Sequence, residues 1–280
     1  MRRKRLMFSK MLQERSLEEV ANYACELGFD GIDLTCRKGG HILSADIEHE
    51  LPRAVAFFGE HGLSVPLITT GITSAREPWA AETFRTAGQC GIPYIKLGYW
   101  LFDKFGQARQ TIDRMRCDLD ELEALAAQNG VCAVVHLHCN HIVSSNPALL
   151  WMLLMDRDVR HIAAYLDPGN MAVEGASYGW KLGMDLLAPY TRMVALKNFR
   201  FEQSAGRQCA EWKAKLCPLQ DGIVPYPEML ELLDRINYTG YVSVHSEDLS
   251  MTPEQRIAQA RLDLAYLDRI ESGQRAHEER

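Results

Sequence analysis

The chain has 280 residues, of which 47% are hydrophobic, 24% charged and 9% aromatic. This composition excludes a disordered or fibrous protein, and the length suits a single large domain with its own hydrophobic core. The net charge of −6 provides no overall attraction to phosphodiester backbones, so binding to nucleic acid is disfavoured.

Helical and extended segments alternate along the chain. Ser16 and Glu19 are spaced as a helix capping box, apolar residues then recur at helical intervals, and Gly28 suits the left-handed end of a helix. Further helices are predicted at residues 48–61, 78–90, 108–128, 147–155, 181–190 and 226–236. Strands are predicted at residues 6–12, 31–35, 63–69, 94–97, 131–136, 162–166, 193–197 and 241–245.

Strands separated by single helices are typical of the βα units that build parallel sheets. The sequence therefore predicts an α/β fold, a (β/α)8 TIM barrel formed by one domain over residues 1–280. A doubly wound open sheet is the main alternative, but no glycine-rich nucleotide-binding sequence follows any strand. Residues 203–220 interrupt the pattern and are predicted to form an excursion over one mouth of the barrel, and residues 252–273 a C-terminal helix.

The cysteines and the N-terminal segment indicate where the protein resides. The eight cysteines include no CxxC pair, which is typical of reduced thiols in a cytoplasmic protein. Basic residues 2–5 precede an apolar run too short for a signal peptide, and no run approaches the roughly 18 residues of a membrane span. We predict a cytoplasmic protein with no membrane contact; homo-oligomer formation stays open.

Polar side chains gather where the predicted strands end, which is where barrel enzymes carry their chemistry. Side chains alternate along a strand, so His136 and His138 share one side of theirs, and His245 and Glu247 share one side of another. If these sides face the barrel axis, Asp167 and Lys197 join them around one cavity. Imidazole and carboxylate groups together suit Zn, Mn or another divalent ion, and without a metal they suit proton transfer.

The order and spacing of these motifs resemble the xylose-isomerase-like barrel superfamily, which includes sugar isomerases and epimerases, inosose dehydratases and endonuclease IV. The resemblance covers nearly the whole chain, from residues 16–34 to residues 240–244. Residues 167–170, Asp-Pro-Gly-Asn, are similar to the family's Asp-x-x-His/Asn signature after the sixth strand, and residues 218–224 to the stretch before its last helix.

The resemblance implies one divalent metal (Zn, Mn or Mg), which the family holds with Glu, Asp, His and Glu on strands five to eight. Only Asp167 matches this pattern; His136 and His245 stand at the two Glu positions, and Ala195 stands at the His position. The metal ligands implied here are therefore His136, Asp167 and His245.

The favoured reaction removes and returns a proton next to a carbonyl of a small polyhydroxylated substrate, as a sugar or sugar phosphate isomerase or epimerase does. Glu247 or His138 would carry the proton, and Lys197 would stabilise the developing enolate oxygen. A dehydratase or keto-sugar lyase on the same site is the first alternative. A non-catalytic sugar-binding barrel is the second, and an endonuclease is a distant further one.

A second group of residues is assigned to binding the carbohydrate substrate. These are His41, Trp100, Asn170, Glu174 and Trp180. The two tryptophans have a structural alternative, since tryptophans usually pack in cores, and so does Asn170, since residues 167–170 are all types that favour a turn.

Overall fold

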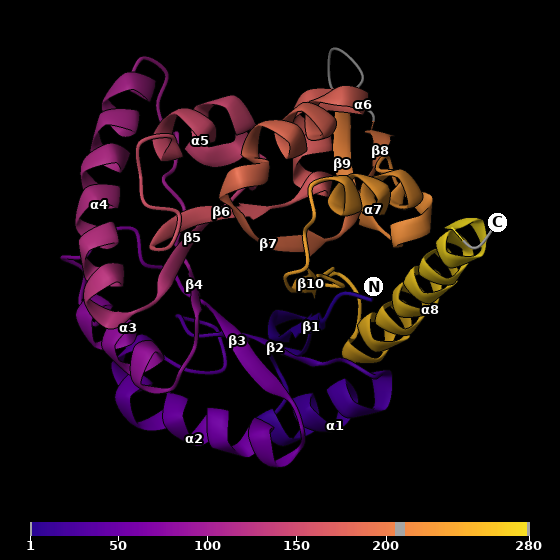
Figure 1. The fold of residues 1–280 in the computed structure, drawn as a ribbon, viewed down its shortest axis with the longest axis horizontal. Coiled ribbons are helices and arrows are strands. Elements are labelled where there is room, and N and C mark those ends of the chain that lie inside the picture. Colours follow the sequence, from indigo (N-terminus) through magenta and orange to yellow (C-terminus); the bar gives the residue numbers. More distant parts are fainter. Residues whose placement is uncertain (1, 205–210, 279–280) are drawn as a thin grey trace.

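Eight parallel strands close into a barrel with the spatial order β1-β10-β7-β6-β5-β4-β3-β2 (Figure 1). The structure is a computed structural model and describes residues 2–204 and 211–278. The barrel strands are β1 (Arg5–Phe8), β2 (Gly31–Thr35), β3 (Ser64–Thr69), β4 (Tyr94–Lys96), β5 (Cys132–His136), β6 (Ile162–Leu166), β7 (Thr191–Leu196) and β10 (Val242–Val244). Because β1 pairs with both β2 and β10, the predicted TIM barrel is confirmed and the open sheet is wrong.

Helices surround the strands on the outside of the barrel (Figure 1). They are α1 (Leu17–Leu27), α2 (Ile47–Glu60), α3 (Ala80–Gln89), α4 (Ala108–Asn129), α5 (Pro147–Leu154), α6 (Pro168–Leu187), α7 (Tyr226–Arg235) and α8 (Pro253–Glu278). The capping box at α1 is confirmed: Ser16 Oγ accepts the N–H of Glu19, whose side chain accepts the N–H of Ser16. Gly28 ends this helix at φ 77°.

Two elements differ from the sequence-based prediction. The first strand ends at Phe8, and Ser9–Leu12 form a 3-10 helix that is largely buried. Because the residues on both sides of Phe8 are largely buried, the sequence pattern does not reveal the residue at which the strand ends. Helix α6 begins at Pro168 rather than near residue 181, because Asp167 Oδ1 accepts the N–H of Asn170 as a helix cap and Pro168 suits the first turn.

The segment after β7 forms a hairpin instead of passing directly to α7. Strands β8 (Asn198–Ser204) and β9 (Glu211–Cys217) pair antiparallel in a separate two-stranded sheet. The excursion predicted for residues 203–220 therefore begins earlier, at Asn198, and its residues 205–210 lie outside the described residues. The base of the hairpin lies at the carboxyl ends of the barrel strands, since Lys197 immediately precedes it.

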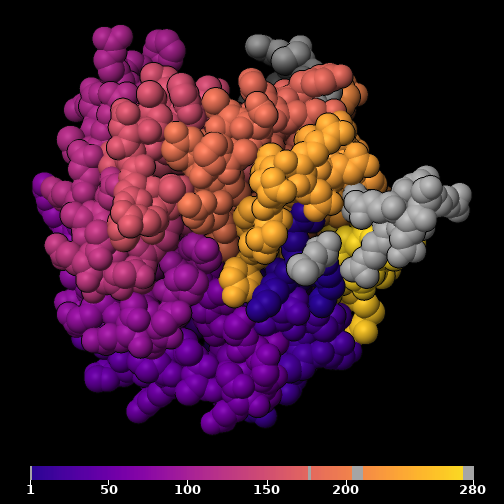
Figure 2. All heavy atoms as spheres, viewed as in Figure 1, coloured from indigo at the N-terminus to yellow at the C-terminus, as the bar shows by residue number. Residues whose placement is uncertain are grey.

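The two ends of the chain meet where the barrel closes. Figure 2 shows the indigo N-terminal segment beside the orange α7 region and yellow α8. Arg5 on β1 pairs with Asp268 and Glu271 on α8, at 2.7 and 2.8 Å. The described cysteines are free thiols, and no helix in the described part of the chain is long and apolar enough to cross a membrane.

The barrel interior below the carboxyl ends is packed with small and apolar side chains. This cluster contains Leu6, Leu67, Cys132, Val134, Ala163, Tyr165, Met193 and Ala195. Since side chains alternate along each strand, residues two positions further on face the same interior, one layer nearer the carboxyl ends. That layer carries the polar groups of the candidate site.

Candidate active site

A cavity of about 170 Å³ opens at the carboxyl ends of the barrel strands. It is lined by Phe8, Lys10, Arg37, Thr69, Lys96, Tyr99, His136, His138, Tyr165, His245 and Glu247. Its volume is below the roughly 300–1,000 Å³ of typical drug-sized pockets, so it accommodates a small ligand. Strands β3, β4, β5 and β6 each contribute a polar side chain to its wall, and the segments that follow strand ends contribute the other polar groups.

Lys197 lies between two carboxylates at the edge of this cavity. Its Nζ is 3.2 Å from Asp167 Oδ2 and 3.2 Å from Glu247 Oε1, and all three residues are buried. Burial disfavours the ammonium, but attraction to Asp167 and Glu247 outweighs that cost and raises the pKa of Lys197. Lys10 pairs with the second Glu247 oxygen at 2.6 Å. The positive charge is therefore fixed in place.

His136 links Asp167 to Tyr99. Its Nε2 is 3.1 Å from Asp167 Oδ2, and its Nδ1 is 3.0 Å from the Tyr99 hydroxyl. Burial, followed by the positive charge of Lys197, lowers the pKa of His136 well below its ordinary value. A neutral His136 then donates from Nε2 to the carboxylate and accepts from Tyr99 at Nδ1. Both ring nitrogens are thereby engaged.

His245 belongs to a separate group of contacts on the other side of the cavity. Its Nε2 is 3.0 Å from the Tyr165 hydroxyl, which donates to Asp33 at 3.3 Å, and its ring stacks on Phe8 at 4.2 Å. Nδ1 faces Glu247 Oε1 at 3.5 Å. Burial opposes a charge on this ring, but the carboxylates of Asp33 and Glu247 outweigh it and raise the pKa of His245.

His138 and Glu247 were both predicted as proton carriers, and they have opposite environments. Burial, then Lys197, lowers the pKa of His138 to about 4, and its Nδ1 bonds to the carbonyl of Cys139 at 3.0 Å. That ring is neutral near pH 7. Burial favours a protonated Glu247, but Lys197 and His245 outweigh it and hold the pKa of this carboxyl well below its usual range. Both oxygens of Glu247 face ammonium groups, of Lys10 and Lys197, whereas His138 bonds to the protein through Nδ1 and has Nε2 left to accept a proton, so His138 suits proton acceptance better.

The residues at the mouth do not fit a divalent metal. The Lys197 ammonium stands between Asp167 and Glu247, and His136 presents an N–H to Asp167. His245 directs both nitrogens to protein groups other than Asp167. Among residues 2–204 and 211–278, no group of three His, Cys, Asp or Glu side chains is arranged to hold a metal ion. Of the predicted ligands, His136 and Asp167 therefore bond to each other, and His245 faces Tyr165 and Glu247 instead.

The five predicted substrate-binding residues lie outside the cavity. Trp100 donates from Nε1 to Asp118, and Trp180 is fully buried in the apolar core against the outer helices. In these two cases core packing decides the position, as it usually does for large aromatic rings. The other three are also engaged with the protein: His41 with Thr35 and the Leu12 carbonyl, Asn170 with Asp167 and the Leu137 carbonyl, and Glu174 with the Asn140 N–H.

Sequence reasoning missed several residues that the barrel brings to the site. Lys96, Asp33 and Tyr165 lie on strands, at positions that alternation directs inward. A charged residue within an otherwise apolar strand was the available signal for Lys96 and Asp33. Lys10 lies in the 3-10 helix Ser9–Leu12 and Arg37 in the loop after β2, where the sequence offers no comparable signal.

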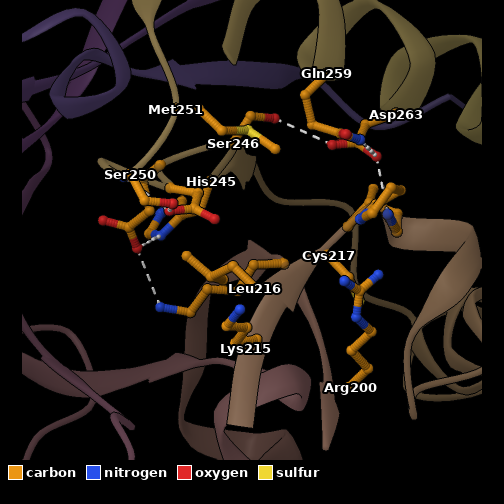
Figure 3. Close-up of a pocket in the computed structure, with 15 residues that line it drawn as sticks. Arg200, Lys215, Leu216, Cys217, His245, Ser246, Ser250, Met251, Gln259 and Asp263 are labelled. Atoms are coloured by element: carbon orange, nitrogen blue, oxygen red, sulfur yellow. Dashed lines mark hydrogen bonds and ion pairs between the residues drawn. The ribbon is translucent and has the colours of Figure 1, made fainter. Parts of the chain in front are cut away.

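A second pocket, of about 160 Å³, adjoins the cavity and shares His245 and Glu247 with it (Figure 3). Arg200 and Lys215 enter it from the β8–β9 hairpin, below His245 in the view. On its far wall, Asp263 accepts from Ser246 and Gln259. The hairpin therefore forms part of the surroundings of Glu247.

The family described as xylose isomerase-like TIM barrel matches residues 21–270. No curated protein matches the sequence. Among solved structures, L-ribulose 3-epimerase is similar with a TM-score of 0.74 and 18% identity, over 99% of this chain and 97% of that one. For 3-keto-D-glucoside 4-epimerase from E. coli the TM-score is 0.67 with 18% identity, over 95% of this chain and 99% of that one. A xylose isomerase-like TIM barrel protein from Mycobacterium smegmatis, in complex with magnesium, is similar with a TM-score of 0.67 and 14% identity, over 96% of each chain. At these identities the likeness is one of fold.

Proposed function

We propose that this chain, which belongs to the xylose isomerase-like TIM barrel family, is a sugar isomerase or epimerase that transfers a proton next to a carbonyl without a divalent metal. The substrate class is a small polyhydroxylated ketone or aldehyde. Epimerases acting on L-ribulose and on a 3-keto-D-glucoside share the fold, which favours this substrate class.

The observation that carries the proposal is the Lys197 ammonium held between Asp167 and Glu247 beside two neutral imidazoles. Removing a proton next to a carbonyl builds negative charge on oxygen, and a fixed positive charge in a buried site stabilises it. The field of Lys197 reaches the cavity, since after burial it is the next cause that lowers the pKa of His138.

Each side chain then has a role that its environment supports. His138 accepts the proton from the substrate carbon, because its ring is neutral and lines the cavity. Asp167 orients the His136 imidazole, which in turn holds the Tyr99 hydroxyl at the wall of the cavity. Glu247 holds Lys197, Lys10 and His245 in position.

Incubation of ketoses and dihydroxyacetone with the enzyme in D2O tests the proposal. We expect NMR to detect deuterium at the carbon next to the carbonyl in otherwise intact substrate. His138→Gln should reduce the exchange rate by roughly 10²–10⁴-fold, the usual contribution of a general base.

Other outcomes would point to the remaining functions. Loss of water or of another leaving group would replace the isomerase with a dehydratase or lyase. Tight sugar binding with no exchange in any substrate would leave a binding protein. Unchanged exchange in His138→Gln would remove that residue from the mechanism.

A further inference from the structure

We propose that Lys96 is a nucleophile that captures the substrate carbonyl covalently, as an imine. This inference rests on the proposed function for the class of substrate, but adds a covalent step and a residue to it. Lys96 ends β4, one strand away from His136, and its side chain lines the cavity.

The first argument is that the Lys96 ammonium has no hydrogen-bond partner among the described residues. It is 1% exposed, and its Nζ is a buried nitrogen with no hydrogen-bond acceptor among the described residues. Its close neighbour is the face of the Tyr99 ring, at 3.5 Å from Nζ to the ring centroid. Buried lysines ordinarily satisfy their ammonium with a carboxylate, as Lys197 does. A lysine left unsatisfied at a cavity wall requires an occupant or a reaction.

The second argument is that Lys96 and Lys197 have opposite surroundings within one site. Burial first, then the positive charge of Arg37, lowers the pKa of Lys96 well below its ordinary value, whereas the two carboxylates raise that of Lys197. A neutral amine carries the lone pair that attacks a carbonyl, and an ion-paired ammonium does not. Lys10 is likewise ion-paired, with Glu247. Lys96 is therefore the nucleophilic amine of the three.

The chemical step balances without a co-reactant. The Nζ lone pair forms a bond to the carbonyl carbon while the C–O π electrons move to oxygen, and one of the two Nζ protons passes to that oxygen. The carbinolamine hydroxyl takes a second proton from solvent water and leaves as water, while the nitrogen lone pair forms the C=N bond of a protonated imine. That cation withdraws electrons from the neighbouring C–H bond, so His138 removes its proton more readily. Water released in the first half is consumed again when the imine hydrolyses.

Reductive trapping tests the inference. The full-length enzyme is incubated with dihydroxyacetone and sodium cyanoborohydride near pH 7 and analysed by intact mass spectrometry and peptide mapping. We expect a mass increase of one dihydroxyacetone minus one water plus two hydrogens, located on Lys96. Lys10 and Lys197 serve as internal controls in the same site and should remain unmodified. Lys96→Met should lose this adduct, as should Lys96→Arg, which keeps a long cationic side chain.

Peptide mapping of the trapped enzyme without any substitution decides the question even if Lys96→Met fails to fold. No adduct, or an adduct spread equally over Lys10, Lys197 and surface lysines, would overturn the inference. Deuterium exchange into dihydroxyacetone without trapping at Lys96 would be consistent with the proposed function and would rule out only the imine. Trapping at Lys96 without deuterium exchange would support the imine and rule out the proposed isomerase function.

Discussion

Replacing Lys197 with methionine should strongly destabilise the fold, because it leaves buried carboxylates without their shared cation. Lys197 is 3% exposed and lies 3.2 Å from both Asp167 and Glu247. Methionine keeps most of the side-chain length, so the loss of charge dominates the effect. Removing one partner of a buried ion pair typically costs about 3–5 kcal/mol.

The remaining contacts place this variant at the lower end of that range. Asp167 Oδ2 keeps His136 at 3.1 Å and Asn170 at 2.6 Å, and Glu247 keeps Lys10 at 2.6 Å. We therefore expect a loss of about 3 kcal/mol in the free energy of unfolding for Lys197→Met. At about 2–4 °C per kcal/mol for a chain of this size, the melting temperature should fall by roughly 6–12 °C.

Urea unfolding followed by circular dichroism at pH 7 measures this change. Lys215→Met is the matched control, since Lys215 pairs with Glu202 at 2.9 Å but is 63% exposed, and it should cost less than about 1 kcal/mol. Adding Glu247→Gln to Lys197→Met should recover part of the loss, because one uncompensated charge disappears. A Lys197→Met variant as stable as the Lys215→Met control would refute the reasoning.

Three further predictions follow from other features. Dialysis against EDTA should leave deuterium exchange unchanged, because Lys197 occupies the space between the carboxylates; a loss that Mn²⁺ restores would contradict this. Burial raises the pKa of Asp263 from 3.8 to about 6, so its stabilising contribution is complete below pH 3.8 and is lost as the pH rises through 6. Asp263→Asn should remove up to about 3 kcal/mol of this pH dependence of the free energy of unfolding. If the curves of unfolding free energy against pH for the variant and the unsubstituted protein ran parallel between pH 4 and 7, the assignment to Asp263 would be wrong. In Gly169→Ala the new Cβ would lie 2.4 Å from the Lys197 carbonyl oxygen, so we expect a loss of about 1–3 kcal/mol and slower exchange. Gly175→Ala, with open space around its Cβ, should instead stabilise helix α6 by up to about 1 kcal/mol, and equal effects of the two substitutions in thermal unfolding would refute the steric argument.

Local signals in the sequence determined the elements and the barrel. The capping box at Ser16, the left-handed glycine at position 28 and the alternation of helix and strand all depend on neighbouring residues, so they are legible without coordinates. The same local logic singled out His136, which ends β5, and His138 and Glu247, which follow strand ends, and all three line the cavity.

Pairings within the site depended on strand order and closure, which no local pattern encodes. The sequence assigned Asp167 to a metal, but the barrel brings Lys197 and Glu247 against it from later strands, so the carboxylate meets an ammonium. Likewise, the sequence shows a lysine within the strand at Lys96, but only the tertiary structure shows that its Nζ is buried with no hydrogen-bond acceptor among the described residues. The charge state of a buried group is fixed by whichever side chains the tertiary structure places around it, and those come from distant parts of the chain.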